Sequence, residues 1–191
     1  LVLAGAVVSE LMRYPLVFVS TLVARVVFCD RLLYMGEPRS MVWDDHRKLY
    51  VDVSDTALGE LHHELYHMMK ERVVGADHMN KSDLVFESLL PVQYSAQYGT
   101  HGIYMRTPGA GEPASRSTLP EMSRAFFPTA YATSCIGEHE AELWKLLMKA
   151  KDEVELLSWL DTEPLQRQAA LLLHRVEQAW PEMGVDWRTT L

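Results

Sequence analysis

The chain has 191 residues, of which 48% are hydrophobic and 23% charged, so it can form one domain with a substantial core. Its formal net charge of −8 and the lack of any Lys or Arg run argue against nucleic acid or an anionic membrane surface as partner. The N-terminal stretch is apolar, but Glu10, Arg13 and Arg25 interrupt it, so we expect no membrane span. Cys29 and Cys135 do not have the spacing of a zinc knuckle.

Three elements are expected in the first part of the chain. Apolar residues at helical spacing predict N-terminal helices over 1–35, one of them started or kinked at Pro15. Two short apolar runs within 41–53 flank a polar stretch and predict a small antiparallel sheet. A Ser or Asp suited to N-capping then precedes a helix expected over 56–74, which Gly75 terminates.

The second part of the chain is expected to be helical around one long connection. A short helix is predicted from Ser82 to Leu90, ending before Pro91. The stretch 91–128 is rich in Tyr, Gly and Pro and lacks periodicity, which is typical of a lid, binding loop or linker. Helices return over 137–181, where Leu recurs at helical spacing. We therefore expect a single domain, mainly α (α+β), with a small antiparallel sheet.

The helix expected over 56–74 carries the pattern His-Glu-x-x-His, formed by His63, Glu64 and His67. An α-helix turns about 100° per residue, so positions four apart share a face and both imidazoles can aim at one point. Glu64 can reach a water bound at that point. This arrangement suits a catalytic zinc, with the Glu as general base. A helix that carries histidines by chance is the alternative, because the motif is short.

A catalytic zinc takes three protein ligands, so a third ligand must come from elsewhere in the chain. Asp77 and His78 could approach the metal where the motif helix ends. Glu138, expected in the first turn of a later helix, could instead complete a His2Glu site, and Glu142 could then accept the spare ring N–H of a ligating His. Acidic residues at a helix N-terminus also stabilise the helix dipole, so the pattern alone leaves these interpretations open.

One set of residues together resembles the gluzincin zinc metallopeptidases. The set comprises His63, Glu64, His67, Tyr131, Glu138 and Glu142. It is most similar to the lethal-factor-like branch and its related small zinc metallopeptidases, in which a Tyr stands seven residues before the ligand Glu and a second Glu four residues after it. The resemblance covers roughly 51–147 and includes a Tyr-Gly loop after Pro91. His101 replaces a Gly of that loop, and His139 replaces the Asp or Phe often found after the ligand Glu.

The resemblance implies a zincin-like metallopeptidase domain whose sheet and C-terminal helices pack on the motif helix. It implies one Zn²⁺ held by His63, His67 and Glu138 with one water. Glu64 would take the proton of the activated water and pass it to the leaving amine. Tyr131 would donate its hydroxyl to the oxyanion. The expected activity is that of a zinc metalloendopeptidase acting on peptides or proteins.

Several other side chains have expected places. Tyr98 and His101 are expected to line the cleft, although a buried loop anchor is an equal alternative. His62 is expected to pack or to point to solvent, because its direction diverges from that of His63 by about 100°. His78 and His139 are expected at the surface. Two other functional classes remain open: an inactive domain stapled by zinc, and a metal-free helical domain that binds a protein partner.

Overall fold

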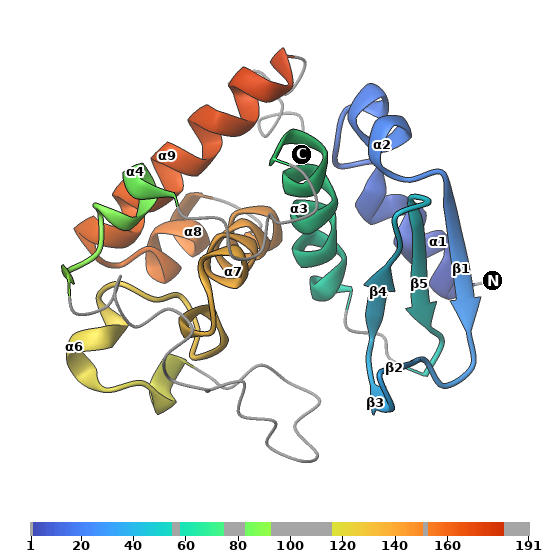
Figure 1. The fold of residues 1–191 in the computed structure, drawn as a ribbon, viewed down its shortest axis with the longest axis horizontal. Coiled ribbons are helices and arrows are strands. Elements are labelled where there is room, and N and C mark those ends of the chain that lie inside the picture. Colours follow the sequence, from blue (N-terminus) through green and yellow to red (C-terminus); the bar gives the residue numbers. More distant parts are fainter. Residues whose placement is uncertain (1, 55–57, 75–82, 93–115, 151–152, 182–191) are drawn as a thin grey trace.

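The structure is a computed structural model that describes residues 2–54, 58–74, 83–92, 116–150 and 153–181 (Figure 1). Its strands are β1 (Arg25–Cys29), β2 (Leu33–Tyr34), β3 (Glu37–Pro38), β4 (Met41–Trp43) and β5 (Lys48–Asp52). Its helices are α1 (Val2–Leu11), α2 (Leu16–Leu22), α3 (Gly59–Val74), α4 (Leu84–Glu87), α6 (Glu121–Arg124), α7 (Ile136–Lys149), α8 (Glu153–Trp159) and α9 (Glu163–Ala179), with 3-10 turns η1 (Arg116–Thr118) and η2 (Tyr131–Thr133). The prediction of a mainly helical α+β chain with a small sheet is confirmed.

The main sheet has the strand order β1-β5-β4 and mixes both pairing directions. β4 and β5 form the predicted antiparallel pair, with Val42 opposite Tyr50. β1 pairs parallel to β5, with Val27 also opposite Tyr50. The prediction of helices over 1–35 is therefore wrong at Arg25–Cys29 and at Leu33–Tyr34, both of which are strands, and the prediction of an antiparallel sheet is wrong for β1. Valine and phenylalanine in this segment favour a pleated, half-buried surface once β5 supplies a partner.

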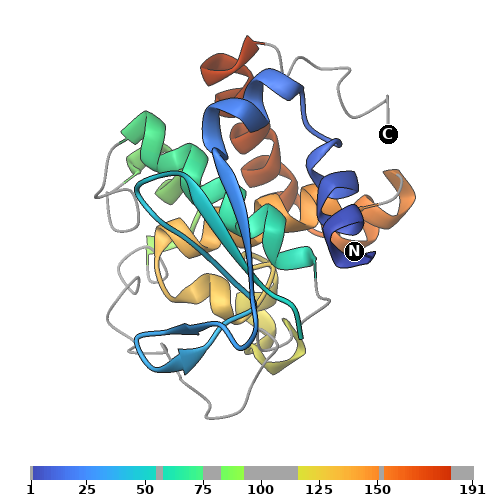
Figure 2. The same ribbon diagram turned by 90° about the vertical axis from the view of Figure 1, so that its right-hand side faces the viewer.

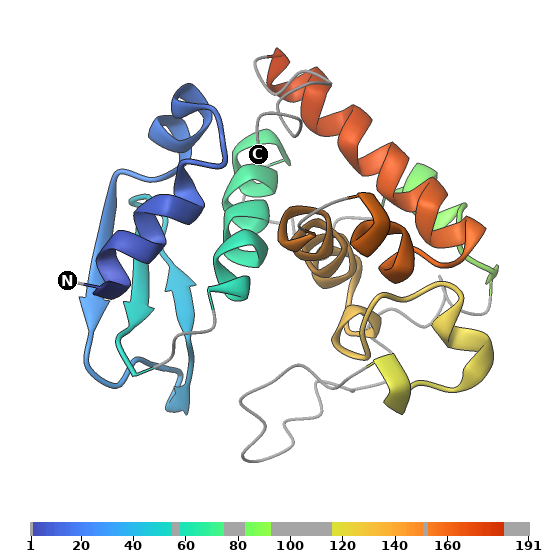
Figure 3. The same ribbon diagram turned by 180° about the vertical axis from the view of Figure 1, so that it is seen from behind.

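α3 occupies the centre of the molecule. The sheet, α1 and α2 lie on one side of it, and α7 with α8 and α9 lie on the other (Figures 1 and 3). Seen from the sheet side, the three strands lie in front of α3 (Figure 2). α3 begins at Gly59, and Val74 is its last described residue. Because α3 is covered from two sides, almost all its residues from Leu61 to Lys70 are buried.

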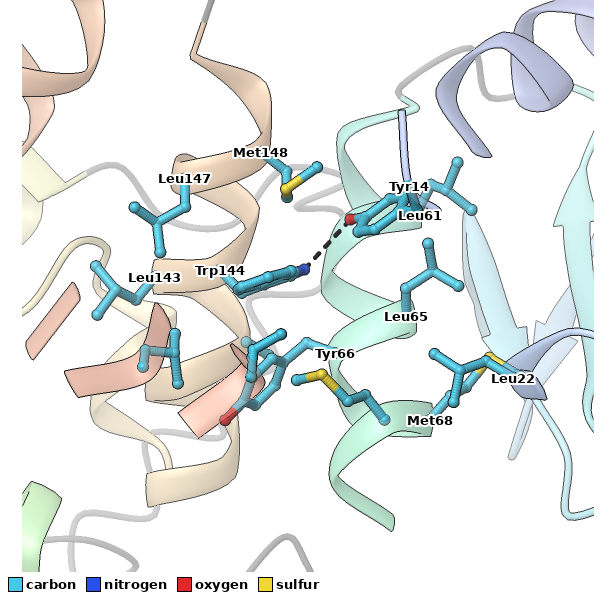
Figure 4. Packing of buried hydrophobic residues seen from close by; sticks show 14 of the residues in the cluster. Tyr14, Leu22, Leu61, Leu65, Tyr66, Met68, Leu143, Trp144, Leu147 and Met148 are labelled. Atoms are coloured by element: carbon cyan, nitrogen blue, oxygen red, sulfur yellow. Dashed lines mark hydrogen bonds between the residues drawn. The ribbon is translucent and has the colours of Figure 1, made fainter. Parts of the chain in front are cut away.

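The main core fills the space on both sides of α3 (Figure 4). Leu61, Leu65 and Leu22 are fully buried on the side of the N-terminal elements, while Trp144 projects from α7. The indole Nε1 of Trp144 donates to the hydroxyl of Tyr14 over 3.2 Å. A buried indole contributes a large apolar area to the core, and this bond satisfies its polar atom. The core therefore fixes α7 against α3, which sets the spacing between the functional side chains on the two helices.

The C-terminal helices follow the prediction for 137–181 closely. α9 begins beside Pro164, where its missing N–H is not needed by the helix. Its residues Leu165, Ala169, Leu172 and Val176 recur at three- or four-residue intervals and are buried. They complete the core behind α7.

The described part of the predicted 91–128 loop contains a short helix. α6 begins after Pro120, and η1 precedes it, so the connection is more ordered there than its composition indicated. Asp83 caps α4, because its side chain accepts from the backbone N–H of Phe86 over 3.0 Å. In the described parts of the chain, no single helix is long and apolar enough to cross a membrane. α1 and α2 are long and apolar enough only when taken together, and their axes are bent by 114° relative to each other.

Candidate metal centre

The two histidines of the motif lie on the face of α3 that meets α7. Their Nε2 atoms are 3.0 Å apart, and both side chains are buried. One helical turn separates them, so their rings meet on one face, with centroids 4.7 Å apart. The predicted convergence of the two imidazoles is thus present in the fold.

Glu138 reaches the same point from the first turn of α7. Its Oε2 lies 2.9 Å from Nε2 of His63 and 3.4 Å from Nε2 of His67. Burial acts to raise the pKa of Glu138, but hydrogen bonds from both histidines hold it well below its usual range. The carboxylate is therefore ionised and available as a ligand.

The spacing of these three atoms suits a single metal ion. Ligands about 2.0–2.1 Å from a tetrahedral zinc are separated from one another by about 3.3 Å. Their observed separations of 2.9, 3.0 and 3.4 Å lie close to that value. Two imidazoles and one carboxylate also form the His2Glu donor set of catalytic zinc sites, which leaves a position for water. The residues present thus fit the metal that the motif implies.

Glu142 contacts His63 from the side of the ring opposite the point where His63, His67 and Glu138 converge. Its Oε1 is 2.9 Å from Nδ1 of His63. Burial acts to raise the pKa of Glu142, but the hydrogen bond from His63 and the nearby charge of Lys145 lower it to about 2. An ionised carboxylate only accepts, so Nδ1 of His63 carries a proton and the ring is held with Nε2 toward Glu138.

His63 lies between the carboxylates of Glu138 and Glu142. Burial disfavours its charged form, but hydrogen bonds to Glu138 and Glu142 outweigh burial and raise the pKa of His63 well above its usual range. The imidazolium then donates from both ring nitrogens. A metal at Nε2 must displace one of these protons.

Glu64 is partly buried beside the three candidate ligands. Burial raises the pKa of its carboxyl to about 7, an effect that His63 opposes and the negative charge of Glu138 reinforces. A carboxyl whose pKa lies near neutrality can both accept and return a proton. That property fits the general-base role expected for it.

Tyr131 reaches the site from η2, just before α7. Its hydroxyl donates to Oε1 of Glu138 over 2.9 Å, and its ring centroid is 5.9 Å from that of His63. The fold thus places this hydroxyl at the edge of the candidate centre. The bond also fixes the second oxygen of Glu138 while the first faces the histidines.

His62 points away from the metal centre, into the core. Its Nδ1 lies 2.9 Å from the hydroxyl of Tyr14, and its Nε2 lies 3.2 Å from a carboxylate oxygen of Glu10. Of the two positions expected for it, packed or facing solvent, it takes the packed one. It joins α3 to α1 and has no part in the metal centre.

The expectation of a surface position for His139 is wrong. Its side chain is fully buried, with its ring 5.1 Å from that of Phe86 and 4.9 Å from that of Phe127, measured between centroids. Burial lowers its pKa to about 3. The acidic residues on both sides suggested a solvated helix face, whereas α7 is covered almost all round.

The remaining expected site residues lie outside the described part of the chain. They are Tyr98, His101, Asp77 and His78. Cys135 lies just before α7 with a free thiol, and burial raises its pKa, which favours packing over reactivity.

Sequence reasoning missed the ionic contacts of two buried lysines on α3 and α7. Lys145 donates to Glu142 and to Glu60, and Lys70 pairs with Glu140 on the opposite side of α7. The only signal for the first was the three-residue spacing of Glu142 and Lys145, which is common on exposed helices. Their burial depends on α3 and could not be read from α7 alone.

Searches with this chain against family models, curated proteins and solved structures gave no significant match. The functional argument therefore depends on the geometry of the site.

Proposed function

We propose that the chain is a zinc metallopeptidase of the gluzincin type with a zincin-like catalytic domain. One observation carries the proposal. Nε2 of His63, Nε2 of His67 and Oε2 of Glu138 converge within hydrogen-bonding distance of one another, beside a partly buried Glu64. Zinc-assisted hydrolysis of a peptide bond uses a ligand set of this kind together with a general base.

His63, His67 and Glu138 would hold the ion. Zinc bound by these residues would lower the pKa of a water and polarise a substrate carbonyl. Glu64 accepts the proton of the attacking water and returns it to the leaving amine. Burial of its carboxyl, which raises its pKa to about 7, supports both halves of this transfer.

Tyr131 supplies a hydroxyl at the edge of the centre. In the structure this hydroxyl donates to Oε1 of Glu138. In the reaction we assign it to the developing oxyanion, where a positioned donor is worth about 10²–10³ in rate. Its place on η2, which leads directly into α7, keeps it close to the third ligand.

The substrate would be a peptide or protein segment in extended conformation. β4 is the outer strand of the three-stranded sheet, on the side of α3 (Figure 1). Arg39, shortly before β4, lies close enough for its charge to act on Glu64. An extended peptide that pairs with this outer strand would therefore pass near the general base.

A peptide-library digest tests this function. Zinc-loaded wild type, Glu64→Gln and Glu71→Gln are each incubated with a proteome-derived peptide library, and new termini are identified by mass spectrometry. Glu71 is also on α3 but does not belong to the candidate centre, so its variant controls for the substitution. We expect cleavage by wild type and Glu71→Gln and none by Glu64→Gln. Equal cleavage by Glu64→Gln at equal zinc content would contradict the proposal.

A further inference from the structure

Lys145 is a buried cation on α7, about two helical turns after Glu138, and only 5% of its surface is exposed. Its Nζ lies 2.8 Å from Oε1 of Glu142 and 2.8 Å from Oε1 of Glu60. Glu60 belongs to the first turn of α3, so the ammonium group bridges the two helices that form the metal centre.

We propose that Lys145 is a positioning residue of the metal centre, which holds Glu142 against His63 and occupies the place of a second cation. This inference rests on the proposed zinc site. It concerns the support of a ligand and assigns Lys145 no contact with substrate.

The first step concerns a single oxygen atom. Oε1 of Glu142 accepts from Nδ1 of His63 over 2.9 Å and from Nζ of Lys145 over 2.8 Å. Oε2 of the same carboxylate is buried and has no hydrogen-bond partner among the described residues. The orientation of Glu142 is therefore set by His63 and Lys145 together. Without the lysine, the carboxylate could rotate and present either oxygen to the imidazole, and His63 would lose its fixed partner.

The second step concerns a second group of donor atoms. Glu60, His63 and Glu142 also bring ligand-type atoms within 4.8 Å of one another. The ammonium group of Lys145 lies within hydrogen-bonding distance of both of these carboxylates. The positive charge of Lys145 thus balances the two carboxylates, Glu60 and Glu142, where a metal ion would otherwise do so. The centre is thus limited to one ion, bound by Nε2 of His63 on the opposite side of the ring.

The test compares zinc affinity by competition with a chromophoric chelator. Loss of an outer partner of a zinc ligand typically weakens binding by about 10–100-fold, and we expect Lys145→Met to raise the Kd for zinc by about 10-fold. Lys145→Arg keeps the charge and the donors and should recover most of the affinity. Lys149→Met, a matched change one turn later at an exposed site, should bind zinc as wild type does.

A second readout separates positioning from mere structural support. The Nδ1–H proton of His63, followed by NMR of zinc-loaded protein labelled with ¹⁵N-histidine, should exchange with water faster in Lys145→Met than in wild type. Glu60→Ala is a second variant, to be used if Lys145→Met does not fold. Glu60 is partly exposed, so its substitution is less disruptive to the core. It removes the anchor of Lys145 on α3 and should raise the Kd in the same direction by a smaller factor.

The outcomes are distinct. If wild type binds zinc and the folded Lys145 and Glu60 variants bind it with the same Kd and the same His63 exchange, the inference is wrong and the proposed function stands. A lowered unfolding midpoint without a change in zinc Kd would likewise assign Lys145 a purely structural role. If wild type binds no zinc, the proposed function fails and this inference fails with it.

Discussion

Nδ1 of His63 lies 2.9 Å from Oε1 of Glu142, although 79 positions separate these residues in the chain. The contact forms because α3 and α7 pack directly against each other, with Trp144 between them in the core (Figure 4). It directs the other nitrogen of His63 toward Glu138. The candidate centre is thus assembled between two helices, and neither helix contains it alone.

Glu138 is expected to be the third zinc ligand. Glu138→Ala should therefore lose zinc affinity by more than the roughly 100-fold that outer partners of a ligand cost. Equilibrium dialysis against buffered zinc measures this change. Asp77→Ala alters the competing candidate from the sequence and should bind zinc as wild type does; loss of zinc in that variant with retention in Glu138→Ala would reverse the assignment.

Zinc binding should release a proton from His63. The pKa of this imidazole is raised well above its usual range because Glu138 and Glu142 stabilise its charged form against the effect of burial. A raised pKa means that the proton is still bound at neutral pH, so zinc affinity should increase as the pH rises through and above neutrality. Calorimetric titration in buffers of different ionisation enthalpy counts the released protons. A binding constant that does not change with pH would contradict this account.

Tyr131→Phe should reduce peptide cleavage while the zinc site remains. Loss of an oxyanion donor costs about 10²–10³ in kcat. The variant also loses one hydrogen bond to Glu138, whose other oxygen still faces the histidines, so zinc content should stay near that of wild type. Tyr50→Phe removes a hydroxyl on β5 that bonds to Asp44, in the turn between β4 and β5, and serves as control. Full activity in Tyr131→Phe would assign the hydroxyl to support of Glu138 alone.

His139 should make the protein less stable in acid. Burial lowers its pKa to about 3, whereas an unfolded histidine titrates near 6.5. The unfolded state therefore binds more protons between these values, and this residue's share of stability is lost as the pH falls through that window. His139→Phe should be less stable at pH 7 by about 1–3 kcal/mol, because a larger ring must enter a fully buried site, but its stability should depend less on pH.

Urea unfolding of the metal-free protein at a series of pH values measures this effect. His46→Phe makes the same substitution at an exposed site and should keep the pH dependence of wild type. If His139→Phe lost stability in acid as steeply as wild type, other groups would account for the acid sensitivity.

Local patterns predicted the elements that carry the site. His63 and His67 lie one turn apart on a helix with clear N- and C-terminal signals, and that helix forms as expected. Glu138 lies in the first turn of a strongly amphipathic helix, so its position at the start of α7 was readable as well. Spacing within each helix was enough for these residues.

Contacts between distant elements could not be predicted in the same way. Arg25–Cys29 carries apolar residues whose spacing also suits a helix, and it becomes a strand because β5, further along the chain, pairs with it. His139 and Lys145 look like surface residues in the sequence of α7. They are buried because Phe86, Phe127 and Glu60 approach from other parts of the chain.

The zinc content of the purified protein tests the central claim most directly. The protein is prepared with excess zinc, dialysed to remove loosely bound ion and analysed by mass spectrometry of the metal, with His63→Ala as control. A His2Glu site predicts about one equivalent of zinc per chain in wild type and much less in His63→Ala. Less than about 0.1 equivalent in folded wild type would contradict the account, because the proposed chemistry requires the bound ion.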